Sequence, residues 1–104
     1  MNPITVILVD DHDVVRWGLR QILEEFADIT VVGEAKDGLA GVALARQLRP
    51  DVVVMDINRP RMNGIAATKL ITQELPSTVV VGLSFDIGAE VTQAMKAAGA
   101  FTCV

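Results

Sequence analysis

Two patterns of apolar residues alternate along the chain. Continuous apolar runs rich in Val and Ile predict buried strands, and apolar residues three or four positions apart predict helices. The predicted strands are residues 4–9, 29–35, 51–55, 78–84 and 100–104, and the predicted helices are residues 14–26, 37–48, 64–75 and 87–99. Apolar strands separated by helices are typical of a parallel sheet that is buried on both faces and joined by right-handed crossovers. The pattern therefore predicts an α/β fold.

Single residues predict how several helices begin or end. Asp37 is a candidate N-cap of the second helix, because its carboxylate can accept a hydrogen bond from a backbone N–H of the first turn. Pro76 is expected to stop the third helix, and Gly99 is expected to end the fourth. On the first helix, we interpret Trp17 as a packing residue rather than a recognition residue.

Composition limits the classes of protein to consider. The chain has 104 residues, of which 51% are hydrophobic and 21% are charged, and this fits one globular domain. A net charge of −4 with scattered basic residues argues against a nucleic-acid-binding surface. One cysteine, Cys103, excludes an internal disulfide framework. The first apolar run lacks a basic flank and stops at two aspartates, so we expect no signal peptide, no membrane span and a cytoplasmic location.

Polar side chains follow three of the predicted strands. Asp10 and Asp11 follow the first strand, Asp56 follows the third, and Ser84 ends the fourth. Ligands of such sheets bind outside the carboxyl ends of the strands. Clustered carboxylates repel one another, and oxygen ligands without clustered His or Cys select a hard cation, so we expect Mg²⁺ rather than Ca²⁺ or Zn²⁺. The alternative is that these aspartates are solvated loop residues and helix caps, with Asp13 capping the first helix.

Three charged or titratable residues near these positions are interpreted as surface residues. His12 lies beside the acidic pair, where it could sense pH or bind metal, but we expect a solvated loop histidine. Arg59 and Arg61 could clamp an anion, but we expect solvated turn residues that soften the local negative charge.

Four segments together resemble the receiver domain of bacterial two-component response regulators. They are, in order, VDDHDVVRWGLRQIL, PDVVVMDINRPRMNGIAA, VVVGLS and AAGA. The likeness covers essentially the whole chain and is particularly close to the NarL/FixJ subgroup, whose receivers precede a LuxR-type helix-turn-helix. It implies a flavodoxin-like doubly wound sheet of five parallel strands in the order 2-1-3-4-5. It also implies one receiver domain over residues 1–104, truncated at its C-terminal end with the fifth helix missing.

The resemblance assigns roles to particular residues. It implies that Asp56 is the phosphoacceptor and that Ser84 takes the place of the switch hydroxyl. It implies a Mg²⁺ site made by Asp10, Asp11, Asp56 and the backbone carbonyl of Asn58.

The chain departs from the family pattern at two positions and lacks a third. Arg59 replaces the methionine usual in the turn after the phosphoacceptor, and Cys103 stands at the position of the switch aromatic. The family's lysine is expected to fall about two positions beyond Val104.

The implied function is that of a signalling domain. Asp56 would accept a phosphoryl group from a sensor histidine kinase, and the resulting shift would control an output such as a DNA-binding domain outside this chain. The chain would catalyse only its own phosphorylation and dephosphorylation, and we expect a homodimer or other self-association. The alternative is a receiver-like interaction module that is not phosphorylated. Cys103 in place of the aromatic and the lack of the family's lysine favour this alternative, and the intact Asp10, Asp11, Asp56 and Ser84 oppose it. An aspartyl-phosphate hydrolase would need a second carboxylate where Asn58 stands, and a nucleotide-binding domain would need a glycine-rich first turn.

Overall fold

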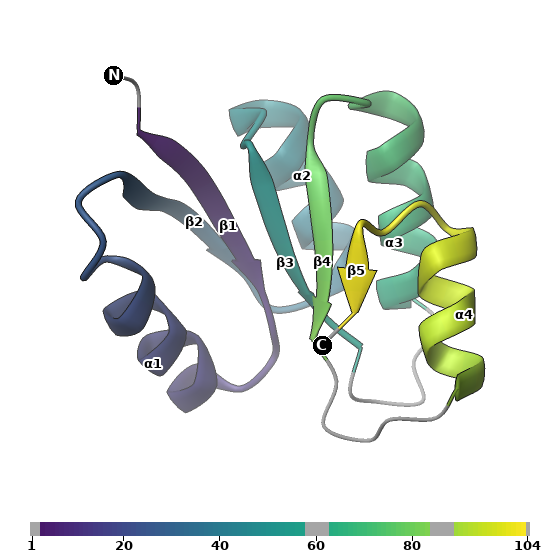
Figure 1. Cartoon of the computed structure of the whole chain (residues 1–104), viewed down its shortest axis with the longest axis horizontal. Coiled ribbons are helices and arrows are strands. Elements are labelled where there is room, and N and C mark those ends of the chain that lie inside the picture. Colours follow the sequence, from purple (N-terminus) through teal and green to yellow (C-terminus); the bar gives the residue numbers. More distant parts are fainter. Residues whose placement is uncertain (1–2, 58–62, 84–88, 104) are drawn as a thin grey trace.

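The computed structural model describes residues 3–57, 63–83 and 89–103, and these form five strands and four helices. In chain order they are β1 (Ile4–Val9), α1 (Asp13–Leu23), β2 (Ile29–Ala35), α2 (Gly38–Leu48), β3 (Val52–Asp56), α3 (Asn63–Glu74), β4 (Val79–Leu83), α4 (Ala89–Ala97) and β5 (Thr102–Cys103). All the strand pairs are parallel, and the order is β2-β1-β3-β4-β5 (Figure 1). The strand order implied by the family resemblance is therefore confirmed.

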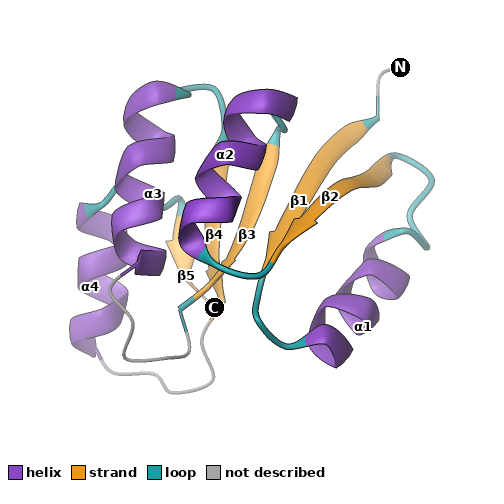
Figure 2. Cartoon of the chain, turned by 180° about the vertical axis from the view of Figure 1, so that it is seen from behind, coloured by secondary structure: helices purple, strands orange, loops and turns teal. Residues whose placement is uncertain are grey.

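Helices cover both faces of the sheet, with α1 on one side and α2 and α3 on the other (Figure 2). Alternate strand residues point to opposite faces, so the two faces carry separate apolar clusters. The larger cluster joins β1, β3 and β4 to α2, α3 and α4, and it includes the fully buried Ile7, Val53, Met55, Val80 and Met95. The smaller cluster lies under α1 and is built around Val6, Leu8 and Val31, with Leu19 and Leu23 packed against it.

The face that α1 covers is less completely buried on β3 and β4. Val53 and Val80, which face the larger cluster, are fully buried, whereas Val54, Val81 and Leu83 are only partly buried. Part of the apolar surface of these strands therefore stays accessible beside α1 in the described part of the chain.

The first helix differs from its prediction. It ends at Leu23 rather than at Phe26, and the backbone continues in tighter turns in which the Phe26 N–H donates to Leu23 O at 3.1 Å. Only one stripe of α1 contacts the sheet. Trp17 points away from it and is 65% exposed, so its interpretation as a packing residue is wrong.

Two predicted helix ends are confirmed. The Asp37 side chain accepts a hydrogen bond from the Ala40 N–H at 2.8 Å, which caps α2. Gly99 follows α4 with a φ of +108°, in the region that favours glycine. The third helix ends one residue before its predicted end, at Glu74, and the predicted start of the fourth at residue 87 lies outside the described residues.

Candidate functional site

Two neighbouring strands bring the acidic side chains together. Asp10 directly follows β1, and Asp56 is the last residue of β3. The parallel register of these strands ends both at the same edge of the sheet. One ligand atom from each of Asp10, Asp11, His12 and Asp56 lies within 4.8 Å of the others. The structure therefore brings together the three aspartates that the sequence singled out.

The carboxylates differ in exposure. The side chains of Asp10 and Asp56 are 2% and 5% exposed, whereas that of Asp11 is 27% exposed. Asp10 Oδ1 accepts a hydrogen bond from the His12 N–H at 2.7 Å. Asp10 Oδ2 is buried, and it has no hydrogen-bond partner among the described residues. A buried oxygen without a donor is costly, and a cation, or a water bound to a cation, would satisfy this atom.

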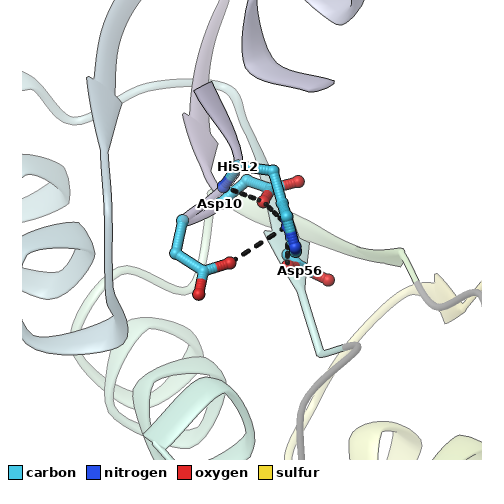
Figure 3. Close-up of side chains that lie close together, drawn as sticks. Asp10, His12 and Asp56 are labelled. Atoms are coloured by element: carbon cyan, nitrogen blue, oxygen red, sulfur yellow. Dashed lines mark hydrogen bonds and ion pairs between the residues drawn. The ribbon is translucent and has the colours of Figure 1, made fainter. Parts of the chain in front are cut away.

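The His12 ring lies against this carboxylate cluster (Figure 3). Its Nδ1 is 2.8 Å from Asp10 Oδ1, 3.0 Å from Asp11 Oδ1 and 3.8 Å from Asp56 Oδ2. The hydrogen bond with Asp10 raises the pKa of His12, and the charges of Asp11 and Asp56 act in the same direction. As predicted, His12 lies in a loop with its side chain 34% exposed, but its ring also contacts the carboxylates and is not simply solvated. The extended backbone of His12, at the N-cap of α1, turns the ring toward the strand ends.

The donor set fits magnesium. Three carboxylates at about 4 Å repel by roughly 4 kcal/mol per pair at an effective dielectric of about 20, and a divalent cation would offset this repulsion. Mg²⁺ prefers oxygen ligands and is usually held by one or two carboxylates with several waters. Such oxygens come from Asp10, through Oδ2, and from the more exposed Asp11. Asp56 adds a third carboxylate to the cluster.

Several predicted residues lie outside the described part of the chain. These are Asn58, Arg59, Arg61 and Ser84. Cys103 lies in β5, as expected for the last strand. Asp13 is the first residue of α1 rather than its cap, and its carboxylate instead accepts a hydrogen bond from Arg16.

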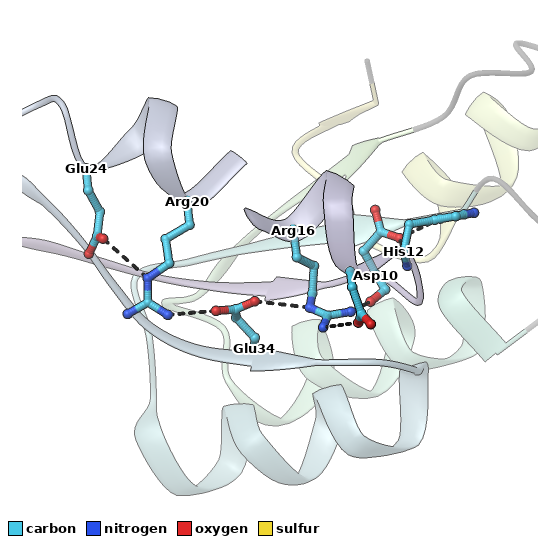
Figure 4. Close-up of polar contacts among 7 residues, drawn as sticks. Asp10, His12, Arg16, Arg20, Glu24 and Glu34 are labelled. Atoms are coloured by element: carbon cyan, nitrogen blue, oxygen red, sulfur yellow. Dashed lines mark hydrogen bonds and ion pairs between the residues drawn. The ribbon is translucent and has the colours of Figure 1, made fainter. Parts of the chain in front are cut away.

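Sequence reasoning missed Arg16, a buried residue of α1. Its guanidinium reaches the backbone carbonyl of Asp10 and joins a row of ion pairs that runs along α1 to Glu24 (Figure 4). The signal that could have found it is an arginine inside the apolar stretch that follows the acidic pair.

No helix in the described ranges is long and apolar enough to span a membrane.

Comparisons with known proteins agree with the fold and the acidic site. The family model described as the response regulator receiver domain matches residues 6–104. The chain is 44% identical over 99 residues to the transcriptional regulatory protein LiaR of Bacillus subtilis (strain 168), covering 95% of the chain and 47% of LiaR. It is 40% identical over 96 residues to the nitrate/nitrite response regulator protein NarL of Escherichia coli (strain K12), covering 91% of the chain and 44% of NarL. The chain thus spans less than half the length of these relatives.

A solved structure shows the same architecture. A chain in the crystal structure of the CheX–CheY–BeF3–Mg²⁺ complex from Borrelia burgdorferi superposes with a TM-score of 0.89 at 25% sequence identity, over 99% of this chain and 78% of that one. The family resemblance read from the four sequence segments is confirmed by the matched family model and by the similarity to LiaR and NarL. The chain belongs to the receiver domain family of two-component response regulators.

Proposed function

We propose that this chain is a phosphoacceptor domain in which Asp56 receives a phosphoryl group from a sensor histidine kinase. The observation that supports this most is the placement of Asp56. Its side chain is 5% exposed at the end of a buried strand, beside Asp10 and Asp11. A carboxylate held rigidly by a strand can be aligned with a phosphorus atom, and neighbouring acidic groups can hold the cation that the transfer needs.

The transfer forms one bond and breaks another. An Oδ atom of Asp56 attacks the phosphorus of a phosphohistidine on the kinase, and the P–N bond breaks with its electron pair leaving on the imidazole nitrogen. The product is an aspartyl phosphate, which adds about two negative charges and three acceptor oxygens to the edge of the sheet. Asp56 acts here as a nucleophile whose position matters more than its basicity.

Asp10, Asp11, Asp56 and the backbone carbonyl of Asn58 would hold Mg²⁺, which neutralises charge on the phosphoryl oxygens when bound. The CheX–CheY complex, which contains BeF3 and Mg²⁺, supports this assignment by its similarity to the chain. His12 sits on the same carboxylates, so its side chain has to share or leave this space when a cation enters.

The response to phosphorylation is assigned to Ser84. Its hydroxyl would donate a hydrogen bond to the phosphoryl group, moving the segment after β4 and shifting a two-state equilibrium by about 1–3 kcal/mol. We propose that this shift controls a DNA-binding domain outside the chain, since LiaR and NarL are regulators more than twice as long as the aligned part. The receiver domain would act in the cytoplasm, where it would meet its kinase.

The test is phosphorylation by a small-molecule donor. We expect the chain incubated with acetyl phosphate or phosphoramidate to gain one acid-labile phosphoryl group, measured by intact mass, only when Mg²⁺ is present. Asp56→Asn should abolish the gain. The matched control is Asp51→Asn, because Asp51 lies at the opposite edge of the sheet, where it accepts a hydrogen bond from the Thr5 N–H.

A folded wild-type chain that stays unmodified with Mg²⁺ would contradict the proposal. That result would favour the alternative of an interaction module that is not phosphorylated.

We further propose that the chain self-associates through the partly uncovered face beside α1. Val81 and Leu83 are only partly buried there, and Val14 and Trp17 are 82% and 65% exposed on α1. Accessible apolar surface of this kind favours association. Light scattering at several protein concentrations should show a mass that rises with concentration, and Val81→Thr should lower that mass. A monomer at every concentration would contradict this expectation.

A further inference from the structure

Arg16 is buried on α1, with 9% of the residue exposed, and its guanidinium makes three hydrogen bonds (Figure 4). Its Nη1 donates to the backbone carbonyl of Asp10 at 2.6 Å, and its Nη2 donates to Asp13 Oδ1 at 2.6 Å. Its Nε donates to Glu34 Oε1, on β2, at 3.0 Å. The planar fork of the guanidinium is therefore fixed in three directions.

The group remains charged despite its burial. Burial alone would lower the pKa of Arg16, but the hydrogen bonds with Asp13 and Glu34 outweigh it and raise the pKa. Burying a cation carries a desolvation cost even when two carboxylates pair with it. This cost points to a role of the fixed guanidinium beyond these two ion pairs. The two carboxylates are bound by Nε and Nη2, and the third nitrogen, Nη1, donates to the Asp10 carbonyl.

That carbonyl belongs to the peptide bond between Asp10 and Asp11. A peptide unit is planar, so the direction of the Asp10 C=O fixes the direction in which the chain enters Asp11. On the other side of the same residue, the Asp10 N–H donates to Ala35 O at 2.9 Å. The strand and Arg16 together hold the backbone that carries both acidic side chains.

Arg20 provides an internal comparison one turn farther along α1. It pairs with the same acidic residue, since its Nη1 donates to Glu34 Oε2 at 2.7 Å, and its Nε donates to Glu24 at 3.3 Å. Its side chain is 41% exposed, against 11% for Arg16. Both arginines therefore pair with Glu34, and the contact with the Asp10 carbonyl distinguishes Arg16.

We propose that Arg16 is a positioning residue for the acidic site: it orients the Asp10–Asp11 peptide so that both carboxylates are presented to Mg²⁺. This inference rests on the proposed function, because it concerns the same site. Residues that orient metal ligands from outside the ligand shell typically contribute about 10- to 100-fold to metal affinity.

The test compares Mg²⁺ affinity in Arg16→Met and Arg20→Met by isothermal calorimetry. We expect Arg16→Met to weaken binding about 10-fold or more, and Arg20→Met to change it by less than about 2-fold. Urea unfolding of the metal-free chains supplies the structural readout, because both variants lose a pairing with Glu34. The ¹³C shift of the Asp10 carbonyl should move in Arg16→Met and stay unchanged in Arg20→Met.

Arg16→Lys keeps the charge and guards against a failure of Arg16→Met to fold. A lysine has no fork and cannot fix three acceptors in one plane, so we expect affinity to fall about 3-fold or more. A folded Arg16→Met or Arg16→Lys chain that binds Mg²⁺ as tightly as wild type would overturn the inference alone. A folded wild-type chain that binds no Mg²⁺ would overturn the proposed function, and the inference with it.

Discussion

Replacing Asp11 with alanine is expected to abolish Mg²⁺ binding, and replacing Asp10 with alanine is expected to weaken it less completely. Asp11 is the more exposed carboxylate, at 27%, and can meet a hydrated cation directly. One oxygen of Asp10 is already engaged by the His12 N–H, so we assign Asp10 a role mediated partly by water. Calorimetric titration of Mg²⁺ into the two variants measures the difference.

The control for this experiment must remove a carboxylate elsewhere. Asp28 is exposed in the loop before β2, at the far edge of the sheet, so Asp28→Ala lowers the net negative charge equally without touching the site. Its Mg²⁺ affinity should match that of wild type. Equal losses in Asp10→Ala and Asp11→Ala would refute the division into direct and water-mediated ligands.

Gly99→Ala is expected to be the most destabilising exchange of a single small residue. A Cβ at this position would lie 2.5 Å from Thr72 Oγ1 and 2.8 Å from Thr72 Cβ, and Gly99 has a φ of +108°. Thr72 cannot move freely, because its hydroxyl donates to Ala98 O at 2.7 Å. Backbone strain and overpacking together should lower the free energy of unfolding by about 3 kcal/mol. The shift of the urea midpoint, with an unchanged slope of unfolding free energy against urea concentration, measures this loss.

Gly18→Ala is the matched control. Gly18 lies within α1, and a Cβ there would meet no atom within 4 Å. Alanine should therefore raise the free energy of unfolding by about 0.5–1 kcal/mol, because glycine is a poor helix former. If Gly99→Ala leaves the midpoint where it is in wild type, the packing between α3 and the end of α4 is looser than the contacts with Thr72 indicate.

The sheet could be predicted because several of its strands are continuous apolar runs in the sequence. Runs such as residues 52–55 are apolar at every position, which is typical of a strand in a parallel sheet with helices on both faces. The end of α1 could not be predicted in this way, because Phe26 continues the helical spacing of apolar residues although the α-helix already ends at Leu23. A pattern of residue types records which positions are apolar and does not record where hydrogen bonding changes.

The aspartates of the site could be predicted from topology alone. Asp10 and Asp56 end parallel strands, and parallel strands end at one edge. His12 and Arg16 could not be predicted in the same way, since their roles depend on side-chain direction. The extended backbone of His12, at the N-cap of α1, turns its ring toward the carboxylates. Arg16 points inward because it pairs with Glu34 on β2.

The division of the acidic site between β1 and β3 has a consequence for the folding equilibrium. Asp10 and Asp56 are far apart in sequence and meet only when these two strands pair, so an unfolded chain has no comparable site. Under the proposed function, Mg²⁺ then binds the native state alone and stabilises it by mass action, by about 2.7 kcal/mol at a free concentration one hundred times Kd. The free magnesium concentration would thereby set the fraction of the domain exposed to proteases, as well as its readiness for phosphorylation.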